Sequence, residues 1–331
     1  MALFSDFQRR LAISPTSLHT VSVIVVIAWV IGGGANPTTS DSIVGLWKLL
    51  PDGVIHPGWF NHMLAILTTV LTIYIIGELN IAHVLLRLNS RSISFTFAAL
   101  MTSCLFLHGF QPGYIVMLFM TLSLFSLFNA YQQENSAGNA YITFLYLGLS
   151  VVLFPKLIWI TPIYVLSFYI LRALNPRSAC ASLLGLLTPP WIVGSIAFCC
   201  GKMAIFNTIL NQMIAFKWGG YSLLPSSQTI MIWLAFAIFA LGTIDFYMRI
   251  YLDKTRTRVI YNVIILHGAA YFLLLLLQPI SSLTLLPITF VITALMGGHY
   301  IANDDTPLSN ILVCMFTSFL IIMYVLNTWI L

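Results

Sequence analysis

The stretch "GNAYITFLYLGLSVVLFPKLIWITPIYVLSFYILR", residues 138–172, decides the fold, because it can form either one long kinked membrane span or two short ones. Two apolar runs, 141–155 and 157–171, flank the pair Pro155-Lys156. Each run is shorter than the roughly 20 apolar residues that a typical transmembrane helix needs. The choice sets the direction of every later span, so the rest of the chain has to settle it.

The composition places the whole chain in a membrane. Of its 331 residues, 60% are hydrophobic and 7% are charged, and the mean hydropathy is +0.97. Soluble domains are typically about 45–50% apolar and about 25% charged. We therefore predict an all-α polytopic transmembrane helix bundle that forms one domain over residues 1–331, surrounded by membrane lipids. The net charge of +5 comes without a basic cluster beside exposed aromatic residues, which argues against nucleic acid as a partner.

Eleven apolar segments are candidates for membrane spans if the opening stretch supplies two of them. They are 17–33, 62–86, 93–109, 113–131, 141–155, 157–171, 182–200, 229–248, 259–277, 281–298 and 308–329. The segments between them are too short to bury a core of their own. Any functional site must therefore be built by the spans and their loops.

The positions of the cations favour two spans in the opening stretch. With eleven spans and a cytoplasmic N-terminus, ten of the 14 cations fall on the inner side: Arg9, Arg10, Arg87, Arg91, Arg172, Arg177, Arg249, Lys254, Arg256 and Arg258. The four on the outer side are Lys48, Lys156, Lys202 and Lys217. Merging 141–155 with 157–171 would move Arg172, Arg177 and the cluster at 249–258 outside, against the positive-inside rule. We therefore predict eleven spans.

Two outer loops, 34–61 and 201–228, are longer than a tight turn, and each contains an amphipathic helix signal. In the first, Ile43, Leu46, Trp47 and Leu50 follow helical spacing. In the second, the apolar residues are Met203, Ile205, Phe206, Ile209, Leu210 and Met213. Helices of this length cannot cross a bilayer, so we expect them to lie on its surface, in the first and fourth outer loops.

The outer side also collects the polar side chains that could bind a charged substrate. They are Asp41, Lys48, Asp52, His56, His62, Lys156, Lys202 and Lys217. Lysines and histidines at headgroup level could hold a phosphate or pyrophosphate, and an acid beside them could act as a general base or bind a divalent cation. We predict no resident cofactor and no metal site built by the protein alone. The alternative is that these are ordinary interfacial residues of a soluble loop.

This order of elements resembles the GT-C class of polytopic glycosyltransferases. The shared features are a cytoplasmic start, an outer loop with an acid and surface helices, and many short-looped spans. Residues 138–172 are similar to the GT-C stretch in which a small-residue helix, an outer-facing lysine and a proline-bearing helix follow one another. The resemblance implies transfer of a sugar from a polyprenyl-phosphate carrier, with Asp41 or Asp52 as the catalytic acid and Lys156 facing the carrier phosphate.

The whole chain also resembles uncharacterised bacterial multi-pass inner-membrane proteins. This second resemblance implies a place in the bacterial inner membrane and leaves open an inactive relative of the GT-C enzymes. The GT-C resemblance implies a role in building the cell envelope.

The predicted spans contain ionisable residues that could have a function, and Glu78, His83, Asp245 and Arg249 at the inner end of the eighth span are the candidates. Glu78 and His83 share the second span, and a charged acid there is costly unless it is paired, neutral or facing a cavity. Asp245 and Arg249 lie four residues apart on the eighth span and are expected to neutralise one another. Glu78 and His83 are either a proton relay or an inter-helix hydrogen-bonding site.

Three classes of function remain open on the sequence alone. The first is a membrane enzyme that uses a lipid-linked substrate, with Asp41 or Asp52 essential. The second is a transporter or flippase that depends on Glu78 and His83. The third is a non-catalytic subunit of an envelope assembly complex, favoured by the lack of a DxD or ExD pair in the first loop.

Overall fold

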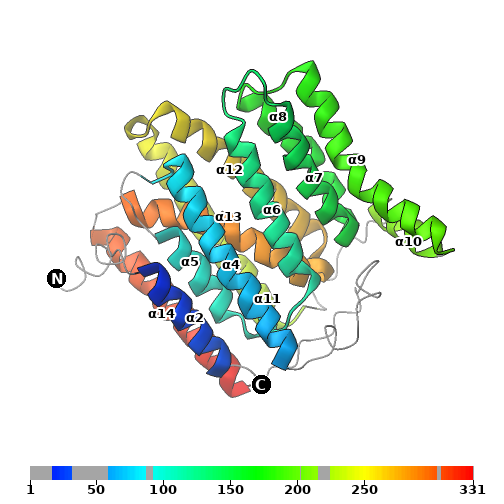
Figure 1. The fold of residues 1–331 in the computed structure, drawn as a ribbon. Helices are drawn as coiled ribbons and strands as arrows, with labels where there is room; N and C mark the ends of the chain where they lie inside the picture. The colour runs from blue at the N-terminus through cyan, green and yellow to red at the C-terminus, as the bar shows by residue number, and fades with distance from the viewer. Residues whose placement is uncertain are drawn as a thin grey trace.

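The computed structural model describes residues 17–31, 59–86, 92–201, 203–214, 224–303 and 307–330, and every regular element within them is a helix (Figure 1). The α-helices are α2 (Ser17–Ile31), α4 (Trp59–His83), α5 (Ser92–Ser103), α6 (Pro112–Asn129), α7 (Ala137–Leu153), α8 (Thr161–Ile170), α9 (Pro176–Cys199), α10 (Met203–Ile214), α11 (Ser226–Arg249), α12 (Thr255–Leu277), α13 (Ser282–Asn303) and α14 (Pro307–Ile330). Short 3-10 helices are η2 (Leu105–Leu107), η3 (Pro155–Ile160), η5 (Ile250–Leu252) and η6 (Pro279–Ser281).

Seven of the described helical segments are long and apolar enough to cross a bilayer. They are α4, α6, α9, α11 with η5, α12, α13 with η6, and most of α14. The chain is therefore a multi-pass membrane protein. The helices α5 and α7 and the η3–α8 segment are apolar but shorter, and α2 has 15 residues. Each predicted span overlaps one of these helices, while the number of eleven crossings stays a prediction.

The opening stretch forms two separate helices that run in opposite directions. The amide of Gln132, just before α7, donates to the carbonyl of Leu171, just after α8 (3.1 Å). The hydroxyl of Ser136 donates to the carbonyl of Ala173 (2.6 Å). The start of α7 and the end of α8 therefore lie side by side. The chain turns between them at Pro155, which starts η3 and has no N–H to continue α7.

The predicted third span, 93–109, is not one continuous helix. It breaks after Ser103, and η2 follows from Leu105 to Leu107. The backbone of Cys104 leaves the helical region, and the hydroxyl of Ser103 donates back to the carbonyl of Leu100 (2.9 Å). A hydroxyl that competes for the last carbonyls favours the end of a helix at this position.

One end of the bundle carries all the arginines of the described residues, and we call it the arginine end. Arg256, at the start of α12, donates to His83 at the end of α4 (3.2 Å) and lies over the ring of Tyr131 after α6. Arg249, at the end of α11, donates to the carbonyl of Asn303 at the end of α13 (3.2 Å). The other described arginines, in or next to the neighbouring turns, are Arg172, Arg177 and Arg258.

The opposite end joins the other termini of the same helices, and we call it the Lys156 end. Asn61, at the start of α4, bonds to the backbone of Phe110 before α6. Lys156 of η3 donates to Ser281 before α13 (3.3 Å). The long helices thus connect an arginine-rich end to an end without arginine among the described residues, as the positive-inside rule expects of a membrane protein.

Helix α13 is the centre of the bundle (Figure 1), and every residue from Ser282 to His299 is buried. Its neighbours approach it at glycines. A Cβ on Gly298 would lie 2.7 Å from the backbone nitrogen of Ile93 in α5, and one on Gly242 of α11 would lie 2.8 Å from the carbonyl oxygen of Met296. Small residues at helix contacts allow such close backbone packing in membranes, where the hydrophobic effect does not drive helices together.

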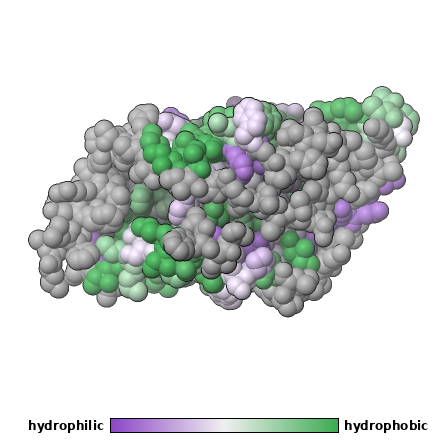
Figure 2. All heavy atoms as spheres, turned by 90° about the horizontal axis from the view of Figure 1, so that it is seen from below, coloured by the Kyte–Doolittle hydropathy of each residue, from purple (hydrophilic) through white to green (hydrophobic). Residues whose placement is uncertain are grey.

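Helix α10 protrudes from the bundle beyond α9 (Figure 1) and fits the predicted surface helix of the loop 201–228. Ile209 is buried, while Asn207 and Asn211 are exposed. In Figure 2, a view of the Lys156 end, the part that protrudes at the right carries hydrophobic residues on one side and hydrophilic residues on the other. The predicted surface helix of the first loop lies outside the described residues.

We expect Gly298→Ala to destabilise the protein by about 1–3 kcal/mol, because the new methyl group would overlap the backbone of Ile93. The matched control is Gly138→Ala, since a Cβ there meets nothing within 4 Å. Both changes replace a glycine with an alanine within a helix, which by itself favours the helix by about 1 kcal/mol. Thermal unfolding in detergent compares them, and equal melting temperatures for the two variants would show that the α5–α13 contact is not tight.

Candidate functional site

Lys156 is the centre of a polar corner at the Lys156 end. Its ammonium group donates to the hydroxyl of Ser281 (3.3 Å), across 125 residues of sequence. The neighbouring side chains Pro155 and Leu157 are buried in the bundle, while Lys156 is partly exposed. The apolar flanks of η3 therefore fix the backbone, and the cation is left at the surface beside η6.

Neutral amides and hydroxyls lie on the elements next to Lys156. The hydroxyl of Ser282 donates to Oε1 of Gln228 at the start of α11 (3.1 Å). Gln278 is 2% exposed, and neither atom of its side-chain amide has a hydrogen-bond partner among the described residues. A buried amide without a partner costs about 1–3 kcal/mol. The corner thus combines a cation with unused hydrogen-bonding capacity, as a binding site for an anion requires.

Trp159 ties helix α10 to this corner. Its indole Nε1 donates to the carbonyl of Met213 near the end of α10 (3.1 Å), while the ring is 55% exposed. An exposed indole at the end of a helix is typical of the membrane–water boundary. The predicted cations Lys202 and Lys217 flank α10 in sequence but lie outside the described residues.

A second polar corner lies at the same end, where α2, α4 and α6 meet. Nδ1 of His62 is 2.9 Å from the carbonyl oxygen of His108. Nε2 of His108 is 3.3 Å from the carbonyl oxygen of Thr102, and its ring stacks on Trp29 with 4.2 Å between centroids. A carbonyl only accepts, so each of these two nitrogens carries the proton. Nε2 of His62 is then an acceptor when the ring is neutral and a donor when it is protonated.

The two corners are neighbours across the first turns of α6 and α13. A Cβ on Gly113 of α6 would lie 2.9 Å from Cα of Thr284 in α13, so these turns are in backbone contact. Tyr114, next to Gly113, reaches the ring of Trp29 (6.3 Å between centroids). Ser281 and Ser282 precede Thr284 and belong to the Lys156 corner. The predicted residues His62 and Lys156 thus lie on either side of the contact between α6 and α13.

The predicted pair Glu78 and His83 is not brought together. Glu78 is exposed on the surface of α4, with no hydrogen bond or ion pair to any described residue. His83 is buried and accepts the hydrogen bond from Arg256 while its ring packs edge-on against Phe125 and Phe128. The predicted ion pair of Asp245 and Arg249 is confirmed, with 2.9 Å between Oδ1 and Nε.

Sequence reasoning missed a buried network at the arginine end. Nε2 of His299 is 3.2 Å from Oδ2 of Asp253 and 2.8 Å from Nδ2 of Asn303. Asn303 also accepts the bond from Arg249 on its carbonyl. These contacts fasten the turn between α11 and α12 to the end of α13. The only signal in the sequence was an acid and a histidine each isolated near a span end, 46 residues apart.

Six of the predicted site residues lie outside the described residues. They are the proposed acids Asp41 and Asp52 and the proposed substrate ligands Lys48, His56, Lys202 and Lys217. Their roles stay predictions.

No family model, curated protein or solved structure matches this chain.

We expect Asn61→Ala to lower the free energy of unfolding by about 1–3 kcal/mol. The side chain of Asn61 accepts from the amide of Phe110 (2.6 Å) and donates to its carbonyl (3.3 Å), and both backbone groups are buried. Asn139→Ala is the control, because the side-chain bond of Asn139 to Gln133 is exposed. A denaturant or thermal titration in detergent measures both, and the hypothesis fails if the control loses as much stability as Asn61→Ala.

Proposed function

We propose that the protein is a GT-C-like glycosyltransferase that binds a polyprenyl-phosphate-linked glycan at the Lys156 end, on the outer face of the bacterial inner membrane. The observation that supports this best is the Lys156 corner, in which a cation lies among buried neutral donors at the membrane boundary. The role proposed for the protein is in building the cell envelope.

A phosphate on a lipid fits this corner for electrostatic reasons. An ammonium group forms a charge-assisted hydrogen bond to a phosphate oxygen, and such bonds are about twice as strong as neutral ones. Near Lys156, the hydroxyls of Ser281 and Ser282 and the amides of Gln228 and Gln278 supply further polar groups. A substrate carried by a lipid can enter sideways from the membrane, because many large apolar side chains are exposed on the surface of the bundle.

In the proposed reaction, Asp41 or Asp52 takes the proton from a hydroxyl of the acceptor. The oxygen of that hydroxyl bonds to the anomeric carbon of the sugar, and the bond from this carbon to the phosphate oxygen breaks. The negative charge that develops on the leaving phosphate is stabilised by Lys156 and, where one is bound with the substrate, by a divalent cation. The acids are therefore needed for transfer, and Lys156 for binding and for the leaving group.

We expect Lys156→Gln to weaken binding of polyprenyl phosphate about 10- to 100-fold, because a hydrogen bond to a charged group contributes about 1.5–3 kcal/mol. The control is Lys254→Gln, since Lys254 is exposed at the arginine end. Native mass spectrometry of the purified protein measures binding of polyprenyl phosphate and of the uncharged polyprenol. Equal losses in both variants, or no loss in Lys156→Gln, would contradict a phosphate site at Lys156. Asp41→Asn and Asp52→Asn test catalysis separately, since a binding subunit would tolerate both.

The orientation predicts which end an impermeant thiol reagent reaches. In a background in which the five native cysteines are replaced by alanine, Ser226→Cys marks the Lys156 end and Glu134→Cys marks the arginine end, and both positions are exposed. We expect a membrane-impermeant maleimide to label Ser226→Cys in intact spheroplasts and Glu134→Cys only after lysis. The reverse pattern would place the Lys156 corner in the cytosol and exclude the proposed substrate side.

A further inference from the structure

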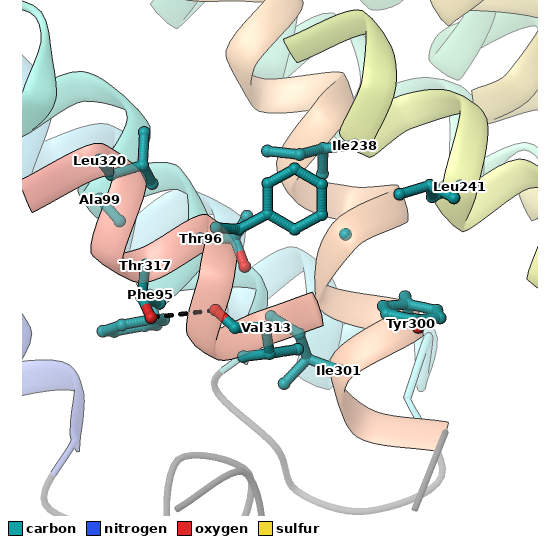
Figure 3. A pocket seen from close by; sticks show the side chains of 12 residues that line it. Phe95, Thr96, Ala99, Ile238, Leu241, Tyr300, Ile301, Val313, Thr317 and Leu320 are labelled. Carbon is teal, nitrogen blue, oxygen red and sulfur yellow. Dashed lines mark hydrogen bonds between the residues drawn. The ribbon is translucent and has the colours of Figure 1, made fainter. Parts of the chain in front are cut away.

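Two cavities lie along α5 and α14 and form one slot. The smaller, about 40 Å³, is enclosed by α5, α11, α13 and α14 near the arginine end, and Tyr300 and Ile301 line it (Figure 3). The larger, about 300 Å³, lies between α2, α5 and α14. Phe95, Ala99, Thr317 and Leu320 line both cavities, so the two adjoin along α5 and α14.

The slot runs parallel to the membrane normal. On α14 it extends from Val313 in the smaller cavity to Tyr324 in the larger one, which is about 16 Å at 1.5 Å per helical residue. This is about half of the roughly 30 Å hydrocarbon layer. Ile321, which lines the larger cavity, is 63% exposed, so the slot opens sideways toward lipid.

The wide end of the slot lies directly beside the His62 corner. Thr102 lines the larger cavity, and its carbonyl is bonded to the ring of His108. The carbonyl of His108 is in turn bonded to His62. The hydroxyl of Thr102 is buried and has no hydrogen-bond partner among the described residues. A molecule in the slot therefore has its polar end at His62 and an unused hydroxyl group next to it.

We propose that the slot holds the isoprenoid chain of the polyprenyl-phosphate carrier, whose phosphate leaves the wide end of the slot past the His62 corner and reaches Lys156. The lining is apolar apart from a few hydroxyls, so hydrocarbon fills it better than water, which needs two to four polar partners. The smaller cavity has a volume of about 40 Å³, which leaves room for the end of one chain. Polyprenyl phosphate has a single chain, whereas a phospholipid has two. This inference rests on the proposed function for the identity of the lipid.

The test fills the slot with a side chain. Ala99 lies where the two cavities join, so Ala99→Trp should lower binding of both polyprenyl phosphate and polyprenol at least tenfold in native mass spectrometry. The matched control is Ala269→Trp, on the exposed side of α12, which should bind both lipids as the unchanged protein does. Unchanged binding in Ala99→Trp would overturn the proposal, and so would a diacyl phospholipid that competes as well as polyprenyl phosphate.

A second measurement needs no variant and covers the case in which Ala99→Trp does not fold. A polyprenyl phosphate with a photoreactive diazirine on its chain should cross-link to the segments 95–102 of α5 and 313–324 of α14. Cross-links spread instead over the exposed surface of α9 would overturn the slot.

The outcomes separate this inference from the proposed function. If Lys156→Gln weakens only the phosphate form while Ala99→Trp has no effect, the phosphate site stands and the slot fails. If polyprenol and polyprenyl phosphate bind equally and Ala99→Trp abolishes both, the slot stands and the phosphate site fails.

Discussion

The close approach of helix backbones to α13 is the contact on which the rest of the structure depends. In a bilayer, helices do not gain by hiding apolar surface from water, so their association rests on van der Waals packing and hydrogen bonds. Gly298 and Gly242 bring α5 and α11 into backbone contact with α13, and Ser92 adds a hydrogen bond to the carbonyl of Gly298 (2.8 Å). Because neighbouring helices enclose α13 along its length, the two ends of α13 determine where the polar groups at both ends of the bundle lie.

The two ends are chemically different, and this difference supports a substrate site at only one of them. At the arginine end, the buried acids Asp245 and Asp253 have partners within the protein, while Arg172, Arg177 and Lys254 are exposed. Arg249 is paired with Asp245, and His299 contacts Asp253. Closed pairs of this kind hold turns in place and leave little capacity for a ligand. At the Lys156 end, Lys156 donates to Ser281, and the side-chain amide of Gln278 has no hydrogen-bond partner among the described residues. A ligand that bonds to this amide would satisfy it.

The features that the sequence predicted well are those set by local patterns. Hydropathy located the helices, and the distribution of arginines separated α7 from α8, because moving one span would have exchanged the sides of all later cations. The ion pair of Asp245 and Arg249 is a contact between neighbours on one helix face. Each of these features depends either on residues that are close in sequence or on the distribution of cations along the whole chain.

The features that were missed depend on which distant segments meet. The end of α5 at Ser103 is a local break that the apolar run hides, since Leu105, Phe106 and Leu107 continue the hydrophobic pattern through η2. The contact of Asp253 with His299 and the slot lined by Ala28, Ala99 and Thr317 each join elements that hydropathy cannot place relative to one another. The exposure of Glu78 and the burial of His83 have the same cause, because only the neighbours of α4 decide which of its faces is covered.

The slot and the polar corners can belong to one binding site, because they lie at different depths in the membrane. A lipid carrier has to be recognised at two depths, its headgroup at the boundary and its chain in the hydrocarbon layer. Thr102 belongs to the slot and, through His108, to the His62 corner, while Gly113 and Thr284 place the Lys156 corner on the other side of one helix pair. A glycan attached to a carrier in the slot would therefore lie over the first turns of α6 and α13. Lys156 would then meet the phosphate that joins the glycan to the carrier, which is the departing group of the proposed transfer reaction.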